Sequence, residues 1–269
     1  MVIRISEPDN PELMICYHLD SITSWAEKKA FQEKFKKEEL EIIYALNRID
    51  ESRVGPGKQL VVPDTLLADL YSYSPFPEQL DFFNDVPKVV LIAQRIQGIA
   101  LYEKGKLLRW GPVSAGKQST PTPNGLHYGN YKSRMKISTV DKAWKLPFYF
   151  NIMNEFGVGV HQYVLPGYPA SHACVRLRMQ DAEFIYNWAN QWTLGSRGQK
   201  LVKNGTPFIV FGKYDYTKPA PWKQLVQDPD NNNLNEAEIN ALKKYAEEYQ
   251  NDKNNFSEAD NQEEVVAVR

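Results

Sequence analysis

The stretch over residues 159–177 limits the possible folds of this chain more than any other part. Pro166, Gly167 and Pro169 lie at its centre. Proline lacks a backbone N–H and fixes φ, so these residues exclude a continuous helix or a central strand. The stretch is therefore predicted to form a loop whose ends lie close together, and these ends carry two of the four histidines and one of the two cysteines.

These residues are His161, His172 and Cys174. A thiol attacks only as the thiolate, so a nucleophilic cysteine needs a nearby base or a positive field. Either histidine is a candidate base for Cys174. Arg176 follows two residues later, and its planar guanidinium suits a carboxylate. The pattern predicts a reactive cysteine in a loop.

Two other interpretations of these residues remain open. Cysteine and histidine are preferred zinc ligands, although their spacing here matches no common zinc signature. A disulfide between Cys16 and Cys174 is the second alternative, because the cysteine count is even. We expect instead that Cys16 is buried and unpaired, since it lies among Met14, Ile15 and Tyr17.

The sequence around the reactive loop resembles the L,D-transpeptidase (YkuD) family. The family signature is a histidine followed by S-H-G-C-[VI]-R, and here His161 is followed by SHACVR at residues 171–176. The similarity extends over residues 87–209. It includes VVLIAQRIQGIALYEKGKLLRWGPVSAGK at 89–117, the TPTPNG turn at 120–125 and GTP at 205–207.

The resemblance implies an enzyme that acts on peptidoglycan stem peptides, at the bond between an L-centred third residue, such as diaminopimelate, and D-alanine. Cys174 would attack the carbonyl, and His161 would accept the thiol proton to give an imidazolium-thiolate pair. His172 completes the catalytic set, mainly by shaping the loop. Backbone N–H groups from His172 to Cys174 would stabilise the oxyanion. No cofactor and no metal ion is implied.

The same resemblance places four residues at the substrate. Arg176 either holds a substrate carboxylate or anchors the loop, and Tyr149 lines the acyl-donor pocket. Ser171 and Ala173 belong to the signature beside the nucleophile. Ala173 stands where the family has glycine, and we expect a negative φ there, with the methyl group narrowing the route to the thiol.

Two further functions remain open. Hydrolysis of the same thioester would make the chain a carboxypeptidase or endopeptidase. A non-catalytic peptidoglycan-binding protein is the alternative from another class, with Ala173 marking a decayed site. The retention of His161, Cys174 and Arg176 argues against decay.

Composition narrows the setting in which the chain acts. With 269 residues, of which 42% are hydrophobic, the chain can bury one large core. A net charge of -1 gives no basic field for nucleic acid, and no apolar run approaches the ~20 residues of a membrane span. The first residues mix charge and proline, unlike a secretory signal. The family resemblance nevertheless implies a location in the cell envelope or periplasm.

The predicted fold class is α+β. Residues 1–63 are expected to form a small α/β module with two helices, and residues 64–86 a connector held down by its aromatic side chains. Residues 87–222 are expected to form a mainly β catalytic domain, a YkuD-like β-sandwich with a buttressing helix. Residues 223–269 are predicted to be an acidic C-terminal helix followed by a disordered tail.

The end of the first module resembles the second half of a LysM carbohydrate-binding module. It has a leucine-asparagine helix end at Leu46 and Asn47, a Pro-Gly turn at residues 56–57 and a short strand closed by Pro63. The Gly-Asp-Thr turn of the first half is not recognisable. Glycan strands are therefore a candidate partner beside stem peptides, and we predict that the module mainly orients the catalytic domain.

Periodicity predicts the individual elements of the rest of the chain. Strands are predicted over residues 89–93, 98–102, 107–115, near Leu126 and over 205–211. A helix is predicted over residues 181–192, with Phe184, Ile185, Trp188 and Trp192 on one face. Asn235 and Glu238 form a capping box that predicts the start of a peripheral C-terminal helix.

Overall fold

The computed structural model describes residues 15–195 and 198–256. Within them the chain forms one nine-stranded sheet, two two-stranded sheets and four α-helices. The strands are β1 (Tyr17–Ile22), β2 (Lys58–Pro63), β3 (Val89–Ala93), β4 (Gly98–Glu103), β5 (Lys106–Ser114), β6 (Gly125–Tyr128), β7 (Lys132–Ile137), β8 (Lys145–Met153), β9 (Val158–Gln162), β10 (Val175–Leu177), β11 (Thr193–Leu194), β12 (Leu201–Lys203) and β13 (Pro207–Phe211). The α-helices are α1 (Trp25–Glu33), α2 (Lys37–Leu46), α3 (Met179–Trp188) and α4 (Glu236–Asn251). Short 3-10 helices are η1 (Glu51–Arg53), η2 (Tyr71–Tyr73), η3 (Asp81–Phe83), η5 (Pro221–Val226) and η6 (Lys253–Asn255).

The N-terminal module has the two helices and two flanking strands that its sequence predicts. Strands β1 and β2 pair antiparallel, and α1 and α2 lie between them in the chain. Ser24 caps α1 by accepting the Glu27 N–H at 3.1 Å. At the end of α2, the Asn47 side chain bonds both the N–H and the C=O of Val61 at 2.8 Å. Asn47 thus ties the helix end to β2, which gives the leucine-asparagine pattern a structural role. The LysM resemblance itself stays a prediction.

Residues 89–211 are built on one mixed sheet with the order β6-β13-β3-β4-β5-β10-β9-β8-β7. The expected sandwich would have two separate sheets, and the structure differs from it. The short strand β10 pairs with β9 on one side and with β5 on the other, so its Arg176 and Leu177 join the two halves into one sheet. That sheet bends over itself into a half-barrel.

The inner face of the bent sheet encloses one core. Side chains from both halves meet in it, such as Val90 of β3 and Val160 of β9, and Ile185 of α3 packs against them. Helix α3 therefore buttresses the sheet, as predicted. The helix ends at Trp188, before the predicted end at residue 192, because the backbone of Asn190 pairs with Thr206 instead. The Asn190 N–H donates to Thr206 Oγ1 at 2.8 Å, and the Asn190 C=O accepts from the Thr206 N–H at 2.9 Å.

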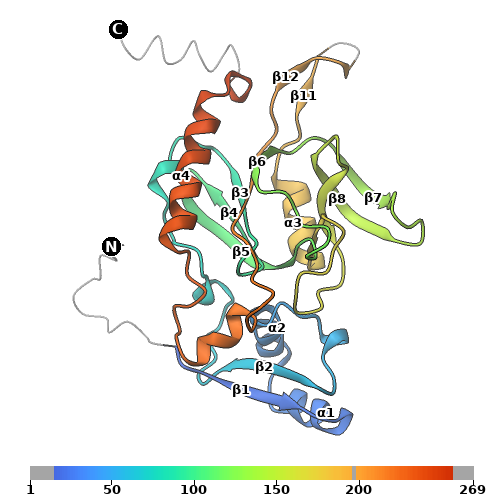
Figure 1. The fold of residues 1–269 in the computed structure, drawn as a ribbon, viewed down its shortest axis with the longest axis vertical. Helices are drawn as coiled ribbons and strands as arrows, with labels where there is room; N and C mark the ends of the chain where they lie inside the picture. The colour runs from blue at the N-terminus through green and yellow to red at the C-terminus, as the bar shows by residue number, and fades with distance from the viewer. Residues whose placement is uncertain (1–14, 196–197, 257–269) are drawn as a thin grey trace, which may run out of the picture.

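The outer face of β3, β4 and β5 is covered by segments from the two ends of the chain. The connector packs there, with Tyr73, Phe76 and Phe83 buried, as its aromatic content predicts. The Tyr102 hydroxyl donates to the connector C=O of Pro77 at 2.6 Å. Figure 1 shows α4 along this side of the sheet and the N-terminal module at one end of the molecule.

Helix α4 begins at the capping box that the sequence predicts, with Asn235 Oδ1 accepting the Glu238 N–H at 2.9 Å. The helix is less peripheral than expected, because Leu242, Ala246 and Tyr249 are buried in the outer core. Arg95 at the end of β3 holds its first turn through a bidentate pair with Glu238. The predicted tail lies outside the described residues.

Five predicted strands correspond to β3, β4, β5, β6 and β13, with bounds that differ by up to two residues. The predictions were residues 89–93, 98–102 and 107–115, a strand near Leu126 and residues 205–211.

Across the described ranges 15–195 and 198–256, none of the helices has the length and apolar character needed to traverse a membrane.

Candidate active site

Cys174 ends the long loop that connects β9 to β10, two strands that lie side by side in parallel. Their register pairs Val175 with Val160 and Arg176 with His161. The two ends of the loop therefore lie close together, as predicted, because β9 and β10 pair. Gly159 lies beside Cys174 in this register, and a Cβ there would come within 2.5 Å of the Phe150 C=O. The glycine allows β8 and β9 to approach closely behind the thiol.

The loop is held by hydroxyl groups from the turn that precedes β6. Thr122 Oγ1 donates to the Ala173 C=O at 2.8 Å, and Thr120 Oγ1 donates to the Ser171 C=O at 3.1 Å. Gly116 N–H donates to Thr122 Oγ1 at 2.9 Å, which fixes that hydroxyl in turn. The TPTPNG turn of the sequence thus acts as a brace for the cysteine.

Ala173 has a φ of +74°, so the expectation of a negative φ was wrong. Left-handed backbone costs a residue with a Cβ about 1–2 kcal/mol. The surrounding hydrogen bonds hold it there, since the neighbouring C=O groups of Ala173 and Cys174 accept from Thr122 and from the Ser171 hydroxyl. A glycine at this position would adopt the same backbone without that cost.

His161 is buried, with only 4% of its surface exposed, and its orientation is fixed by its own neighbour. Nδ1 lies 2.9 Å from the Gln162 C=O, which can only accept, so Nδ1 carries the proton. Nε2 is left unprotonated and able to accept one. Burial lowers the pKa of His161 to about 4, and the nearby Arg176 cation acts in the same direction.

The Cys174 thiol is also shifted toward its neutral form. Burial raises its pKa, against opposing contributions from the Gly159 backbone, Lys136 and Arg176. With His161 neutral as well, the resting pair is a thiol beside an imidazole. Both shifts favour a neutral resting pair, from which the proton moves when the thiol reacts, and the imidazolium-thiolate pair that the resemblance implies stays a prediction.

His172 and Arg176 have different surroundings. His172 is exposed, and its Nε2 accepts from Lys117 Nζ at 3.0 Å. Its ring centre lies 5.3 Å from that of Trp144. Arg176 donates to the Ala170 C=O at 3.0 Å and lies over the Tyr163 ring at 4.8 Å. Arg176 thus anchors the loop and also lines a cavity beside Cys174.

Tyr149 and Ser171 contribute mainly to the wall and the loop. Tyr149 is completely buried, its ring stacks on His161 with centres 6.3 Å apart, and its hydroxyl donates to the Gly157 C=O at 2.8 Å. The Ser171 hydroxyl donates to the Cys174 C=O. Tyr149 also lines a cavity at the thiol, and its role at the acyl donor stays a prediction.

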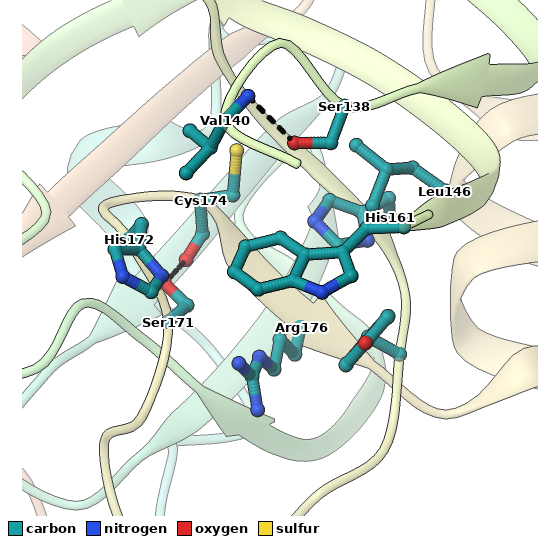
Figure 2. A pocket seen from close by; sticks show the side chains of 10 residues that line it. Ser138, Val140, Leu146, His161, Ser171, His172, Cys174 and Arg176 are labelled. Carbon is teal, nitrogen blue, oxygen red and sulfur yellow. Dashed lines mark hydrogen bonds between the residues drawn. The ribbon is translucent and has the colours of Figure 1, made fainter. Parts of the chain in front are cut away.

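Two cavities reach Cys174, and the segment at residues 138–140 borders both. Figure 2 shows the Cys174 sulfur directed toward Val140, with His161 and Leu146 on one side of it and His172 on the other. The first cavity is lined by Ser138, Val140, Trp144, Leu146, His161, Tyr163, Ser171, His172, Cys174 and Arg176. The second is lined by Pro123, Lys136, Ser138, Thr139, Val140, Leu146, Tyr149, Phe156, Gly157, Val158, His172, Ala173 and Cys174.

The sequence-based reasoning missed Thr120, Thr122, Lys136 and Trp144. The two threonines lie in the TPTPNG turn, which the family resemblance marked without giving it a role. Lys136 and Trp144 flank the 138–140 segment, and only the pairing of β7 with β8 brings them to the thiol. No local sequence signal separates them from other surface residues.

The alternative roles of the cysteines find no support. Both Cys16 and Cys174 are free thiols, and Cys16 is exposed, contrary to the expectation that it is buried. Cys16 precedes β1, where the neighbouring Tyr17 packs against the core instead. Across residues 15–195 and 198–256, no group of three His, Cys, Asp or Glu side chains is placed to hold a metal ion.

Residues 87–210 match the sequence model of the YkuD family. The match supports an L,D-transpeptidase catalytic domain at residues 87–210, which is the domain that the model describes. No curated protein sequence matches the chain.

Solved structures of L,D-transpeptidases are also similar to the chain. The enzyme from Stackebrandtia nassauensis is 24% identical with a TM-score of 0.39, covering 48% of this chain and 57% of its own. The one from Mycobacterium smegmatis is 20% identical with a TM-score of 0.38, covering 47% and 59%. A mutant from Enterococcus faecium is 20% identical with a TM-score of 0.37, covering 46% and 50%. The chain thus matches little more than half the length of these proteins.

The backbone at Ala173 makes a prediction about stability. Replacing alanine by glycine normally lowers the free energy of unfolding by about 0.4–1 kcal/mol, because glycine has more freedom in the unfolded chain. Ala170→Gly, in the same loop but without a positive φ, should show this loss. Ala173→Gly should show no loss or a small gain, because relief of the left-handed strain offsets it. Urea denaturation of both variants tests this, and equal losses would contradict the assigned φ.

The electrostatics predict how alkylation of Cys174 depends on pH. Burial raises the pKa of the Cys174 thiol above the ~8.5 of a free cysteine. The thiolate is therefore lost at a higher pH than in a free cysteine. The rate of iodoacetamide alkylation in a Cys16→Ser background should therefore rise through an inflection above pH ~8.5. A rate that stays at its plateau below pH ~6 would show a resting thiolate-imidazolium pair instead.

Proposed function

We propose that the chain is a cysteine-dependent L,D-transpeptidase that cross-links peptidoglycan stem peptides through a thioester on Cys174. The observation that carries the proposal is His161, which is fixed through Nδ1 and lines the same cavity as Cys174. The match of residues 87–210 to the L,D-transpeptidase catalytic domain supports the substrate class. A location in the cell envelope belongs to the same proposal.

The first half of the reaction forms the thioester. Cys174 Sγ attacks the carbonyl carbon of the third stem residue while its proton passes to His161 Nε2. The negative charge on the carbonyl oxygen is received by backbone N–H groups of residues 172–174, which donate no other hydrogen bond within the described residues. The C–N bond then breaks, and D-alanine leaves as an amine after taking the proton from His161.

The second half transfers the acyl group. An amine of another stem peptide attacks the thioester and gives a proton to His161, and Cys174 leaves and regains a proton. Two cavities beside the thiol favour this outcome over hydrolysis, because one can hold the acyl chain while the other admits an amine. Hydrolysis, as in a carboxypeptidase or endopeptidase, remains the second candidate, since water can follow the same path.

We further propose that the N-terminal module orients the reactive loop. The backbone of residues 48–50 pairs with the loop at residues 165–167: Gly167 N–H donates to the Arg48 C=O, and Asp50 N–H donates to the Leu165 C=O, each at 2.9 Å. The Asp50 carboxylate accepts the Leu165 N–H at 2.9 Å. These bonds support a positioning role, and a glycan-binding role of a LysM-like fold is not needed for it.

The nucleophile is tested with a carbapenem, whose strained carbonyl resembles the scissile one. Intact-mass measurement should find one adduct, absent in Cys174→Ala and retained in Cys16→Ser. His161→Ala should slow adduct formation by about 10²–10⁴-fold, because the proton acceptor is lost.

Mass spectrometry of muropeptides then separates the outcomes, since cross-linked dimers support the transpeptidase and trimmed monomers support the hydrolase. An adduct that persists in Cys174→Ala rules out the nucleophile.

The positioning role of the module is tested at Asp50. Asp50→Ala leaves the buried Leu165 N–H without an acceptor, so the free energy of unfolding should fall by about 1–3 kcal/mol. Carbapenem acylation of Cys174 should slow by about tenfold to hundredfold, because the loop is displaced. Asp50→Asn keeps an acceptor oxygen and should restore most of the rate. Glu41→Ala, an exposed change on α2, is the control. Unchanged acylation in Asp50→Ala would refute the role.

A further inference from the structure

The turn that connects β3 to β4, residues 94–97, contains a buried residue with a strained backbone. Gln97 has a φ of +48° and is completely buried. Left-handed backbone is unfavourable for a residue with a Cβ, whereas glycine adopts it at no steric cost. Such strain persists only where the surrounding structure holds the residue, and it clusters at functional sites. The contacts of the Gln97 side chain therefore indicate what the strained backbone provides.

The Gln97 amide joins this turn to the residue that follows β5. Its Oε1 accepts the Ala115 N–H at 2.8 Å, and its Nε2 donates to the Gln94 C=O at 2.6 Å. A backbone N–H can only donate and a backbone C=O can only accept, so the two partners fix the orientation of the amide. Ala115 is completely buried, so loss of Gln97 would leave its N–H without this acceptor.

Ala115 carries the connection on to the reactive loop. Its C=O accepts the N–H groups of Ala170 and Ser171, each at 3.1 Å. Ser171 lies three residues before the thiol, and its hydroxyl donates to the Cys174 C=O. A continuous series of hydrogen bonds therefore runs from the Gln97 side chain through Ala115 to the residues that precede the thiol.

Gln94 supports the other side of the loop. Its Nε2 donates to the Thr122 C=O at 3.0 Å and to Asn124 Oδ1 at 2.7 Å. The Thr122 hydroxyl in turn donates to the Ala173 C=O. Because Gln97 Nε2 also bonds the Gln94 C=O, the two glutamines form one unit that holds both segments in contact with the loop.

The two central residues of the turn connect it to α4 and to the N-terminal module. Arg95 pairs with Glu238 of α4, and the Ile96 C=O accepts from Arg48 Nε at 2.9 Å. These contacts hold the turn from outside the reactive loop. Each of the four residues of the turn thus bonds a different segment of the chain, and two of the bonds lead to the thiol.

We infer that Gln97, together with Gln94, is a positioning residue for Cys174 and acts through the two segments that hold residues 170–174. This inference rests on the proposed function and adds to it a group that does not touch substrate. The two glutamines set the direction in which the sulfur and the backbone N–H groups of residues 172–174 face a bound carbonyl. A displacement of about 1 Å at reacting atoms costs on the order of a hundredfold in rate.

Carbapenem acylation of Cys174 in two variants of Gln97 tests the inference. In Gln97→Asn the amide is one methylene short of the Ala115 N–H, but asparagine tolerates left-handed backbone, so this variant should fold. Gln97→Met keeps the length of the side chain and loses both polar atoms. In both, the acylation rate at saturating carbapenem should fall by about tenfold to hundredfold. The carbapenem concentration at half the maximal rate should stay unchanged, because no residue of the cavity walls is altered.

Tyr102→Phe is the matched control. It removes one hydrogen bond of a buried side chain, that to the Pro77 C=O, on the outer face of the same sheet. Its acylation rate should equal that of the unmodified protein. An equal fall in Tyr102→Phe, which would reflect a general loss of stability, overturns the inference. Unchanged acylation in both Gln97 variants overturns it as well.

Amide hydrogen exchange provides a readout that needs no reaction. The N–H groups of Ala170 and Ser171 should exchange about two- to tenfold faster in Gln97→Asn, because their acceptor at Ala115 is less firmly held. Tyr102→Phe should leave their exchange unchanged. Equal exchange in all three proteins contradicts the positioning role. Absence of a Cys174 adduct in the unmodified protein would instead refute the proposed function, and the exchange rates would still decide whether Gln97 holds the loop.

Discussion

The position of the thiol depends on the hydrogen bonds that tie residues 171–174 to the turn at residues 116–122. Thr122 connects the two segments, since its hydroxyl accepts from Gly116 N–H and donates to the Ala173 C=O. Gly116 must be glycine, because a Cβ there would lie 2.3 Å from the Thr120 C=O. The strained backbone of Ala173 is tolerable only inside this network, which sets the direction of the Cys174 side chain. The adjacent N–H groups have no hydrogen-bond acceptor among the residues that the structure describes.

Burial then determines the chemistry of the site. The Cys174 thiol and the His161 imidazole are both drawn toward their neutral forms, His161 to a pKa of about 4. A neutral thiol reacts slowly with adventitious electrophiles, because only the thiolate is strongly nucleophilic. A bound carbonyl changes this balance, since the charge that develops moves onto an oxygen beside unpaired N–H donors. The arrangement therefore favours proton transfer during attack over a standing ion pair.

The sequence was sufficient where local chemistry decides the structure. Short apolar runs predicted β3 and β4, and the Asn235–Glu238 pair predicted the start of α4. The sequence was insufficient where contacts between distant segments determine the structure. Helix α3 stops early because Asn190 pairs with Thr206, and β10 joins the halves of the sheet through contacts distant in sequence. The φ of Ala173 was mispredicted because its cost is offset by a hydroxyl group 51 residues away, at Thr122.

The N-terminal module and the nine-stranded sheet share one hydrophobic core. Arg48 is completely buried, donates to the Ile96 C=O at 2.9 Å and lies 5.0 Å from the Trp222 ring centre. Burial lowers its pKa to about 9. Arg48 Nε and Nη1 donate to backbone C=O groups, while Nη2 has no hydrogen-bond partner among the described residues. Separating the segments around Arg48 would expose apolar surface and break the bond to Ile96. The same residue's C=O receives the Gly167 N–H of the reactive loop. The module is thus bound to both the sheet and the loop, and these contacts are the basis of the positioning role that we propose for it.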